Sequence, residues 1–175
     1  VNVARPYDGH RTLARRNIRV LSFSSRHLLA AIRAPGLAID VLVEHAPHSR
    51  RTEEEVGDWW YRIEQCVAKR AQPAPLYCLL DANATVGSVQ SNHIGSMAPE
   101  CENHAGKRSH SSLQTTNQMA PGTFLESFSG VYGTWLRPGL SQDTPQHRID
   151  YITMPLESLE SVLKYGVDID LDLSL

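Results

Sequence analysis

At the centre of this chain lies the segment Leu76-Tyr77-Cys78-Leu79-Leu80-Asp81-Ala82-Asn83. It predicts an apolar strand that stops on a carboxylate and is followed, two residues later, by an amide. Open α/β sheets place their chemistry at such strand ends. A carboxylate and a carboxamide at this spacing can both point into a cleft, where they suit a hard cation and a phosphate oxygen. The pattern is also typical of a strand followed by an Asp/Asn turn, and this segment alone leaves both interpretations open.

Residues 52–70, which precede that strand, predict an amphipathic helix. Thr52 and Glu55 have the spacing of a capping box, and acids fill the first turn. One helical face is apolar, and its members are Val56, Trp59, Trp60, Ile63 and Val67. We expect the two tryptophans to anchor this face against a sheet rather than to bind a ligand.

Short apolar runs elsewhere predict further strands. They cover residues 17–24, 27–33 (where a helix is also possible), 37–45, 123–129, 133–136, 148–153 and 167–175. The run at 37–45 is almost continuously apolar, which suits a strand covered on both faces. Residues 107–118 predict a short helix and residues 155–163 a helical turn.

Composition describes an ordinary globular chain of 175 residues, enough for one domain. The formal net charge of −2 gives no overall attraction to nucleic acid, so such binding would need a local basic surface. Three widely spaced cysteines indicate reduced thiols in an intracellular protein of the nucleus or cytoplasm. Neither a secretory signal pattern nor an apolar run of the ~20 residues that cross a membrane is found.

Several chemistries lack their motifs. The Gly106-Lys107 pair has no upstream glycine of a phosphate-binding loop, and neither a Gly-x-Ser-x-Gly nor a Gly-x-Gly-x-x-Gly pattern occurs. The long irregular region at 88–106 is expected to be functional or disordered. Its polar residues leave open a zinc site or solvated loop side chains, the candidates being His93, Cys101, His104 and, just beyond, His110.

Four segments in fixed order resemble the endonuclease/exonuclease/phosphatase superfamily, which includes deoxyribonuclease-like enzymes. They are residues 43–49 (Val-Glu-His-Ala-Pro-His-Ser), 80–84 (Leu-Asp-Ala-Asn-Ala), 133–135 (Gly-Thr-Trp) and 148–152 (Arg-Ile-Asp-Tyr-Ile). The retrotransposon-type endonucleases are the most similar group. The resemblance implies an α/β fold, a four-layer α-β-β-α sandwich of two mixed sheets flanked by helices.

The resemblance also implies that residues 1–175 form a single domain truncated at both ends. The family's N-terminal metal-binding Glu and its C-terminal Ser-Asp-His motif have no counterpart here. We therefore expect part of the active site to be missing and the isolated chain to be marginally stable, with uncovered sheet edges and apolar surface.

Site residues follow from the same resemblance. Asp81 would orient or deprotonate the attacking water beside the metal, and Asn83 would contact the metal and a phosphate oxygen. His45 would hydrogen-bond the scissile phosphate, and Asp150 would orient a catalytic histidine that this chain lacks. The substrate-binding candidates are His48, Arg50, Arg148 and Trp135, with a structural role as the alternative for the last two. The implied cofactor is Mg²⁺ or Mn²⁺.

The function implied is a divalent-metal-dependent phosphodiester hydrolase, specifically an endonuclease acting on DNA and derived from a retroelement protein. DNA is then the expected partner, with no membrane and no obligate protein partner. Two alternatives stay open. One is a catalytically degenerate domain kept as a structural or binding module, and the other is a phosphatase or phosphodiesterase acting on lipid or inositol phosphate.

Overall fold

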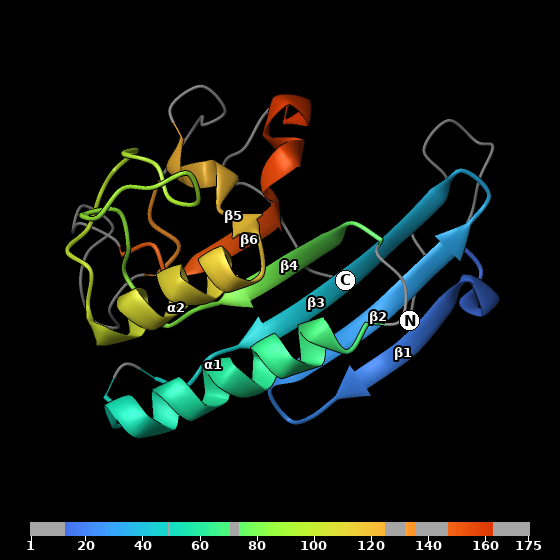
Figure 1. The fold of residues 1–175 in the computed structure, drawn as a ribbon, viewed down its shortest axis with the longest axis horizontal. Helices are drawn as coiled ribbons and strands as arrows, with labels where there is room; N and C mark the ends of the chain where they lie inside the picture. Colours follow the sequence, from blue (N-terminus) through green and yellow to red (C-terminus); the bar gives the residue numbers. More distant parts are fainter. Residues whose placement is uncertain (1–12, 49, 71–73, 125–131, 136–146, 163–175) are drawn as a thin grey trace.

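The computed structural model describes residues 13–48, 50–70, 74–124, 132–135 and 147–162. These residues form a six-stranded mixed sheet with two α-helices packed against it (Figure 1). The strand order is β1-β2-β3-β4-β6-β5, with bounds β1 Ile18–Phe23, β2 His27–Ala34, β3 Leu37–His45, β4 Leu76–Asp81, β5 Gln118–Met119 and β6 Asp150–Pro155. The helices are α1 (Glu53–Ala68) and α2 (His104–Thr115). The α/β class predicted from sequence is confirmed.

The centre of the sheet is the parallel pair β3 and β4, joined by α1 as the crossover. All other neighbours are antiparallel. Both helices cover the same face of the sheet (Figure 1). Among the described helices, none combines the length and apolarity needed to span a membrane.

Helix α1 forms as its sequence predicts. The Thr52 side chain accepts a hydrogen bond from the Glu55 amide at 3.2 Å, and the Glu55 carboxylate accepts one from the Thr52 amide at 3.1 Å. The buried face of α1 packs on β2, β3 and β4, with Ile63 and Val67 in one cluster with Leu42. Trp60 is buried, Trp59 packs beside it, and their role as core anchors is confirmed.

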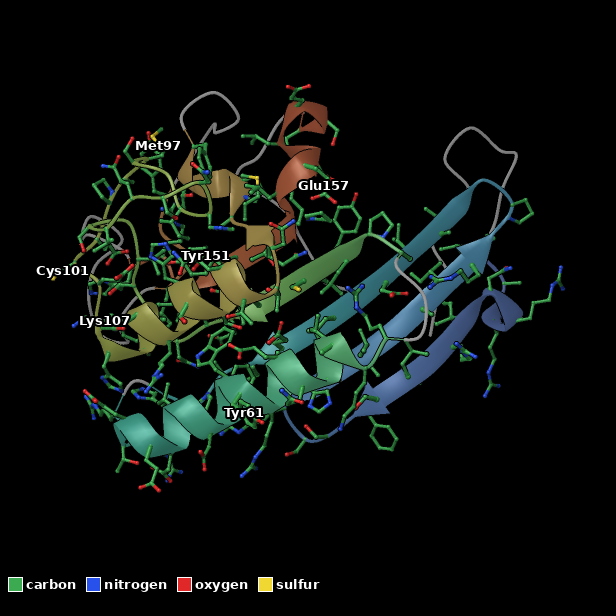
Figure 2. The ribbon with its side chains drawn as sticks, viewed as in Figure 1. Tyr61, Met97, Cys101, Lys107, Tyr151 and Glu157 are labelled. Carbon is green, nitrogen blue, oxygen red and sulfur yellow. The ribbon has the colours of Figure 1, made fainter. Side chains whose placement is uncertain are left out.

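A second cluster lies under α2, at the ends of β4 and β6. Tyr151 of β6, labelled in Figure 2, is buried in it together with Leu80 and Leu113. The Tyr151 hydroxyl donates to the backbone carbonyl of Arg148 at 2.7 Å, so the aromatic ring also fixes the start of β6. Tyr61, on the outer face of α1, points to solvent instead.

The opposite face of the sheet is apolar but open in the described structure. One in-register row crosses five strands, and its members are Phe23, Leu28, Val43, Leu79 and Ile152. Each is an exposed large apolar side chain, from 40% for Leu28 to 76% for Phe23. The prediction that β3 is covered on both faces is wrong for the described residues, because only the helix side of β3 is buried. The second sheet of the expected four-layer sandwich is not among the described residues.

Two predicted boundaries are shifted by side-chain hydrogen bonds to the backbone, one local and one distant in sequence. Helix α2 begins at His104, three residues before the predicted start, because the Asn103 side chain caps it by accepting from the Gly106 amide at 2.7 Å. Strand β6 begins at Asp150 and not at Arg148, because the Arg148 amide donates to a carboxylate oxygen of Glu100 at 2.8 Å instead of to a strand.

Other predictions fall at the edge of the described residues. Thr123 belongs to a 3-10 segment (Pro121–Thr123) and not to a strand, because its amide donates to the Ala120 carbonyl within a tight turn. Residues 125–129 of the predicted strand at 123–129 lie outside the described residues. The predicted strand at 167–175 also lies outside them. Trp135 forms an isolated bridge with His147, and the predicted helical turn is the 3-10 segment Leu156–Ser161.

Candidate active site

Three strand ends bring polar side chains to one edge of the sheet. His45 is the last residue of β3, Asp81 the last of β4 and Asp150 the first of β6. In register, His45 pairs with Asp81, and Asp81 pairs with Asp150. Each lies two positions from a member of the exposed apolar row, so all three side chains lie on the open face of the sheet.

The side chains of this group are in close reach of one another. His45 Nε2 lies 3.6 Å from Asp81 Oδ2. Asp81, Asp150 and Thr134 line an open cavity of about 370 Å³, whose other walls include Leu79 and the rest of the β4–β6 surface. The site therefore combines acids with an imidazole on an apolar floor.

Asp150 carries the electrostatic signature of this arrangement. Its pKa is raised, mainly because the carboxyl is partly buried and also because of the charge of Asp81. A hydrogen bond with Thr134 and the charge of His45 act in the opposite direction. Thr134 Oγ1 also accepts from the amides of Ile149 and Asp150, at 3.1 Å each, and so fixes the entry to β6.

Asn83 has features of both interpretations of the segment 76–83, the Asp/Asn turn and the ligand site. Its backbone has a positive φ of 46°, and its amide donates to Asp81 Oδ1 at 3.1 Å, which is the Asp/Asn turn. Its Nδ2 donates to the Ala46 carbonyl at 3.0 Å, which ties the loop after β3 to the loop after β4. The amide has a second hydrogen and a carbonyl oxygen with which to contact a ligand.

The four substrate-binding candidates are placed differently. His48 and Arg50 lie in the exposed loop after β3, where His48 Nδ1 accepts from the Arg50 amide at 3.2 Å. Arg148 is buried, and its guanidinium donates to the carbonyls of Gly122 and Met97 at 2.8 and 2.9 Å (Met97 is labelled in Figure 2). Trp135 is exposed and stacks on His147, with 6.1 Å between ring centroids.

The structure thus brings together His45, Asp81, Asn83 and Asp150, and it gives Arg148 the contacts of a residue that holds loops in place. Sequence reasoning missed Thr134 as part of the site. The signal available was its place in the Gly-Thr-Trp segment, but its contacts join it to residues 15 and 16 positions away.

The zinc alternative has no support in the described structure. His93 Nδ1 lies 2.6 Å from the Gln118 carbonyl, and His110 lies between Ser91 and Glu102, 2.8 and 2.9 Å from their oxygens. Across the described residues, no group of three or more His, Cys, Asp or Glu side chains could hold a metal ion.

Comparisons with known proteins place the fold. Neither a family model nor a curated protein matches the sequence. Among solved structures, the endonuclease domain of TRAS1, a telomere-specific non-LTR retrotransposon, is similar with a TM-score of 0.50 and 17% identity, over 82% of this chain and 58% of that one. A β-hairpin deletion mutant of beta toxin from Staphylococcus aureus gives 0.51 and 14% identity, over 84% and 49%.

The chain has the fold of the endonuclease/exonuclease/phosphatase superfamily. The resemblance inferred from the four motifs is confirmed at the level of the fold. A structure described as an endonuclease/exonuclease/phosphatase family protein, from Leptotrichia buccalis, is also similar, with a TM-score of 0.45 and 13% identity over 77% of this chain and 46% of that one. The part matched by this chain is between 46% and 58% of the length of each of the three structures.

On this endonuclease/exonuclease/phosphatase fold, the side chains of the site supply some of the oxygen ligands that magnesium prefers. Asp81 and Asp150 offer two carboxylates on paired strand ends, and Asn83 offers an amide oxygen. Mg²⁺ commonly takes one or two protein carboxylates and completes its coordination with water and phosphate oxygens. Burial and, secondarily, the charge of Asp81 raise the pKa of Asp150, and a bound cation would offset both effects.

Proposed function

We propose that this chain is the core of a divalent-metal-dependent phosphodiester hydrolase that acts on DNA as an endonuclease. The observation that carries the proposal is the meeting of His45, Asp81 and Asp150 at the ends of β3, β4 and β6. The similarity to the TRAS1 endonuclease domain supports the choice of nucleic acid as substrate.

Each residue has a role that its position supports. Asp81 stands between His45 and Asp150 in the register, so its carboxylate can accept a proton from a water molecule in the cavity. His45 is exposed and can donate a hydrogen bond to a phosphate oxygen. Asn83 links the two loops, which holds the Asp81 carboxylate in one orientation.

Magnesium or manganese would be held by Asp81 and Asp150, with Asn83 as a further oxygen donor. When bound, the ion would supply a positive charge that polarises the phosphodiester. Without a cation, Asp150 retains its proton to higher pH than an ordinary aspartate, because of burial and the charge of Asp81.

The test is magnesium-dependent nicking of supercoiled plasmid, with metal binding followed separately through the relaxation of water protons by Mn²⁺. We expect nicking that EDTA abolishes, and a loss of on the order of a hundredfold or more in Asp81→Ala. Asp58→Ala removes an exposed acid from α1 and should leave nicking unchanged. Equal activity in Asp81→Ala and the unchanged protein would overturn the assignment.

One observation favours the alternative of a catalytically degenerate module, namely that the described residues hold no group of three metal-ligating acids or imidazoles. In that case the protein would not bind Mn²⁺ and would not nick plasmid, but it would still melt cooperatively. Hydrolysis of a phospholipid or an inositol phosphate without nicking would instead indicate a different substrate for the same site.

A further inference from the structure

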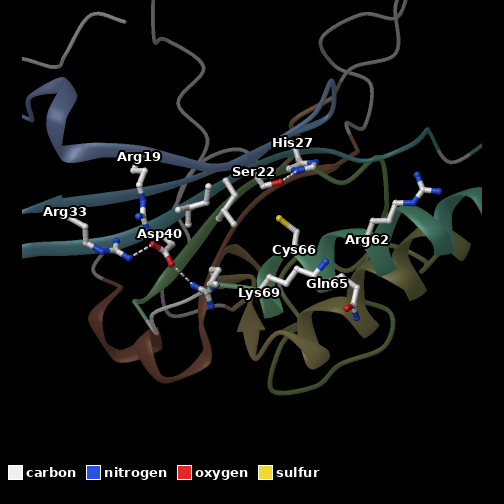
Figure 3. A pocket seen from close by; sticks show the side chains of 12 residues that line it. Arg19, Ser22, His27, Arg33, Asp40, Arg62, Gln65, Cys66 and Lys69 are labelled. Atoms are coloured by element: carbon white, nitrogen blue, oxygen red, sulfur yellow. Dashed lines mark hydrogen bonds and ion pairs between the residues drawn. The ribbon is translucent and has the colours of Figure 1, made fainter.

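A second cavity, of about 510 Å³, lies between the β1–β2–β3 side of the sheet and the C-terminal half of α1 (Figure 3). Its size is that of a small-molecule pocket. It is separate from the acidic site. Asp40, on its wall, precedes His45 by five positions on β3, about 17 Å along the strand, and faces the helix side of the sheet instead of the open side.

The lining of this cavity is strongly cationic. Among the described residues that line it, one is a carboxylate and five are basic, namely Arg19, Arg33, Arg62, Lys69 and Arg70. This local excess of four positive charges occurs in a chain whose formal net charge is −2. The charges therefore gather here and do not reflect the composition as a whole.

The single acid is fully engaged and cannot neutralise the rest. Asp40 is only 1% exposed, and its two oxygens accept from Arg33 at 2.7 Å and from Arg70 at 3.2 Å (Figure 3). This triad, in which only the acid is fully buried, positions two arginines on the wall while satisfying the acid. It is a built feature of the cavity, because it links β2, β3 and the end of α1.

Three cations remain on the two sides of the cavity. Arg19 comes from β1, Arg62 from α1, and Lys69 is the residue that caps the C-terminal end of α1. None of the three forms an ion pair with a described residue. Between them lie apolar side chains, including the buried Leu29, and the Ser22 hydroxyl, 2.9 Å from His27 Nε2. Cations on facing walls can reach adjacent anionic groups of one ligand.

We propose that this cavity binds a compact ligand carrying two or more adjacent phosphate groups, either a nucleoside polyphosphate or a free polyphosphate. Arg19, Arg62 and Lys69 supply the charge, while the Asp40 triad holds Arg33 and Arg70 in place. The site is independent of the proposed phosphodiesterase chemistry, since it lies on the other face of the sheet.

The test is titration calorimetry with ATP, inorganic tripolyphosphate and a short single-stranded DNA. The variant is Arg62→Ala/Lys69→Ala, and the matched control is Arg16→Ala/Lys107→Ala, which removes the same charge from exposed residues outside the cavity. All four substituted residues are exposed, so thermal melting should stay unchanged and will show that both variants fold.

We expect ATP or tripolyphosphate to bind the unchanged protein and the control alike, and the cavity variant at least about tenfold more weakly. Tighter binding of ATP would identify the nucleoside form, and equal binding would identify the polyphosphate. No binding of either, an equal loss in the control, or binding of DNA alone would overturn the proposal.

Discussion

At the scale of single residues, Glu44 and His45 show how two neighbours on one strand receive opposite environments. His45 is exposed at the candidate site, whereas Glu44 points to the helix side and is 5% exposed. Its Oε2 finds no hydrogen-bond partner among the described residues. Burial raises the pKa of Glu44 from 4.5 to about 8, although a hydrogen bond with Cys78 opposes this.

The pH dependence of stability should follow from this carboxyl. The unfolded chain loses the Glu44 proton near pH 4.5 and the folded protein near pH 8. Stability should therefore fall as the pH rises between these values, by roughly 1.4 kcal/mol per unit from this group alone. Glu44→Gln should remove that slope and be more stable than the unchanged protein at pH 8, as measured by urea unfolding.

Glu53→Gln provides the control, because Glu53 is an exposed acid in the first turn of α1. It should leave the slope between pH 5 and 8 unchanged, to within a few tenths of a kcal/mol. If Glu44→Gln has the same pH slope as the unchanged protein, Glu44 does not titrate in this window.

Local sequence pattern predicts the site only where a residue ends a recognisable strand, whereas Asp150 was expected from the resemblance to the superfamily. Asp81 stands at the end of an apolar run, so its location follows from local pattern. Thr134 contacts Asp150 across 16 positions, and no local pattern encodes such a contact. The sequence also does not show to which face of the sheet Glu44 points, because the surrounding run is apolar at positions on both faces.

At the scale of elements, β4 presents adjacent leucines to opposite environments. Leu80 is 5% exposed and packs in the cluster under α2, whereas Leu79 is 45% exposed on the open face. Leu80→Ala should lower the free energy of unfolding by about 2–4 kcal/mol, and Leu79→Ala by about 1 kcal/mol or less. Chemical denaturation of both variants checks this, and equal losses would show that the open face is covered in solution.

The elements that sequence predicts well are those with strong local signals. Helix α1 has its capping box and apolar face, and β3 and β4 have exact boundaries because a turn or a polar residue ends each run. Helix α2 was misplaced by three residues because its start depends on the Asn103 cap. The start of β6 depends on Glu100, which lies 48 positions before Arg148.

At the scale of the whole molecule, sequence indicated the α/β class and the endonuclease/exonuclease/phosphatase fold, but not which face of the sheet is open. Periodicity marks strands as apolar on one or both sides, whereas coverage depends on what packs against them. The cationic cavity was equally hidden, since Arg19 lies on β1, Asp40 on β3 and Lys69 just after α1.

The exposed row on the open face should control how the isolated chain behaves in solution. Its five in-register side chains span about 19 Å across the sheet, given the usual spacing of strands. Contiguous apolar surface of this kind binds apolar dyes and promotes self-association, whereas single exposed apolar residues do not. We expect Val43→Thr/Leu79→Thr to reduce the fluorescence of a bound naphthalene-sulfonate dye, because threonine keeps the strand preference while removing apolar area.

Val89→Thr is the matched control, since Val89 is 53% exposed in the loop after β4 and outside the row. It should leave dye fluorescence and the sedimentation coefficient as they are in the unchanged protein. Val43→Thr/Leu79→Thr should lower the dye fluorescence and, if the unchanged chain self-associates, the sedimentation coefficient as well. The reason is that the two substituted positions lie on adjacent strands at the centre of the exposed row. Equal dye binding by the two variants would mean that the row is not accessible as one surface, and the open face would then have to be covered by the chain itself.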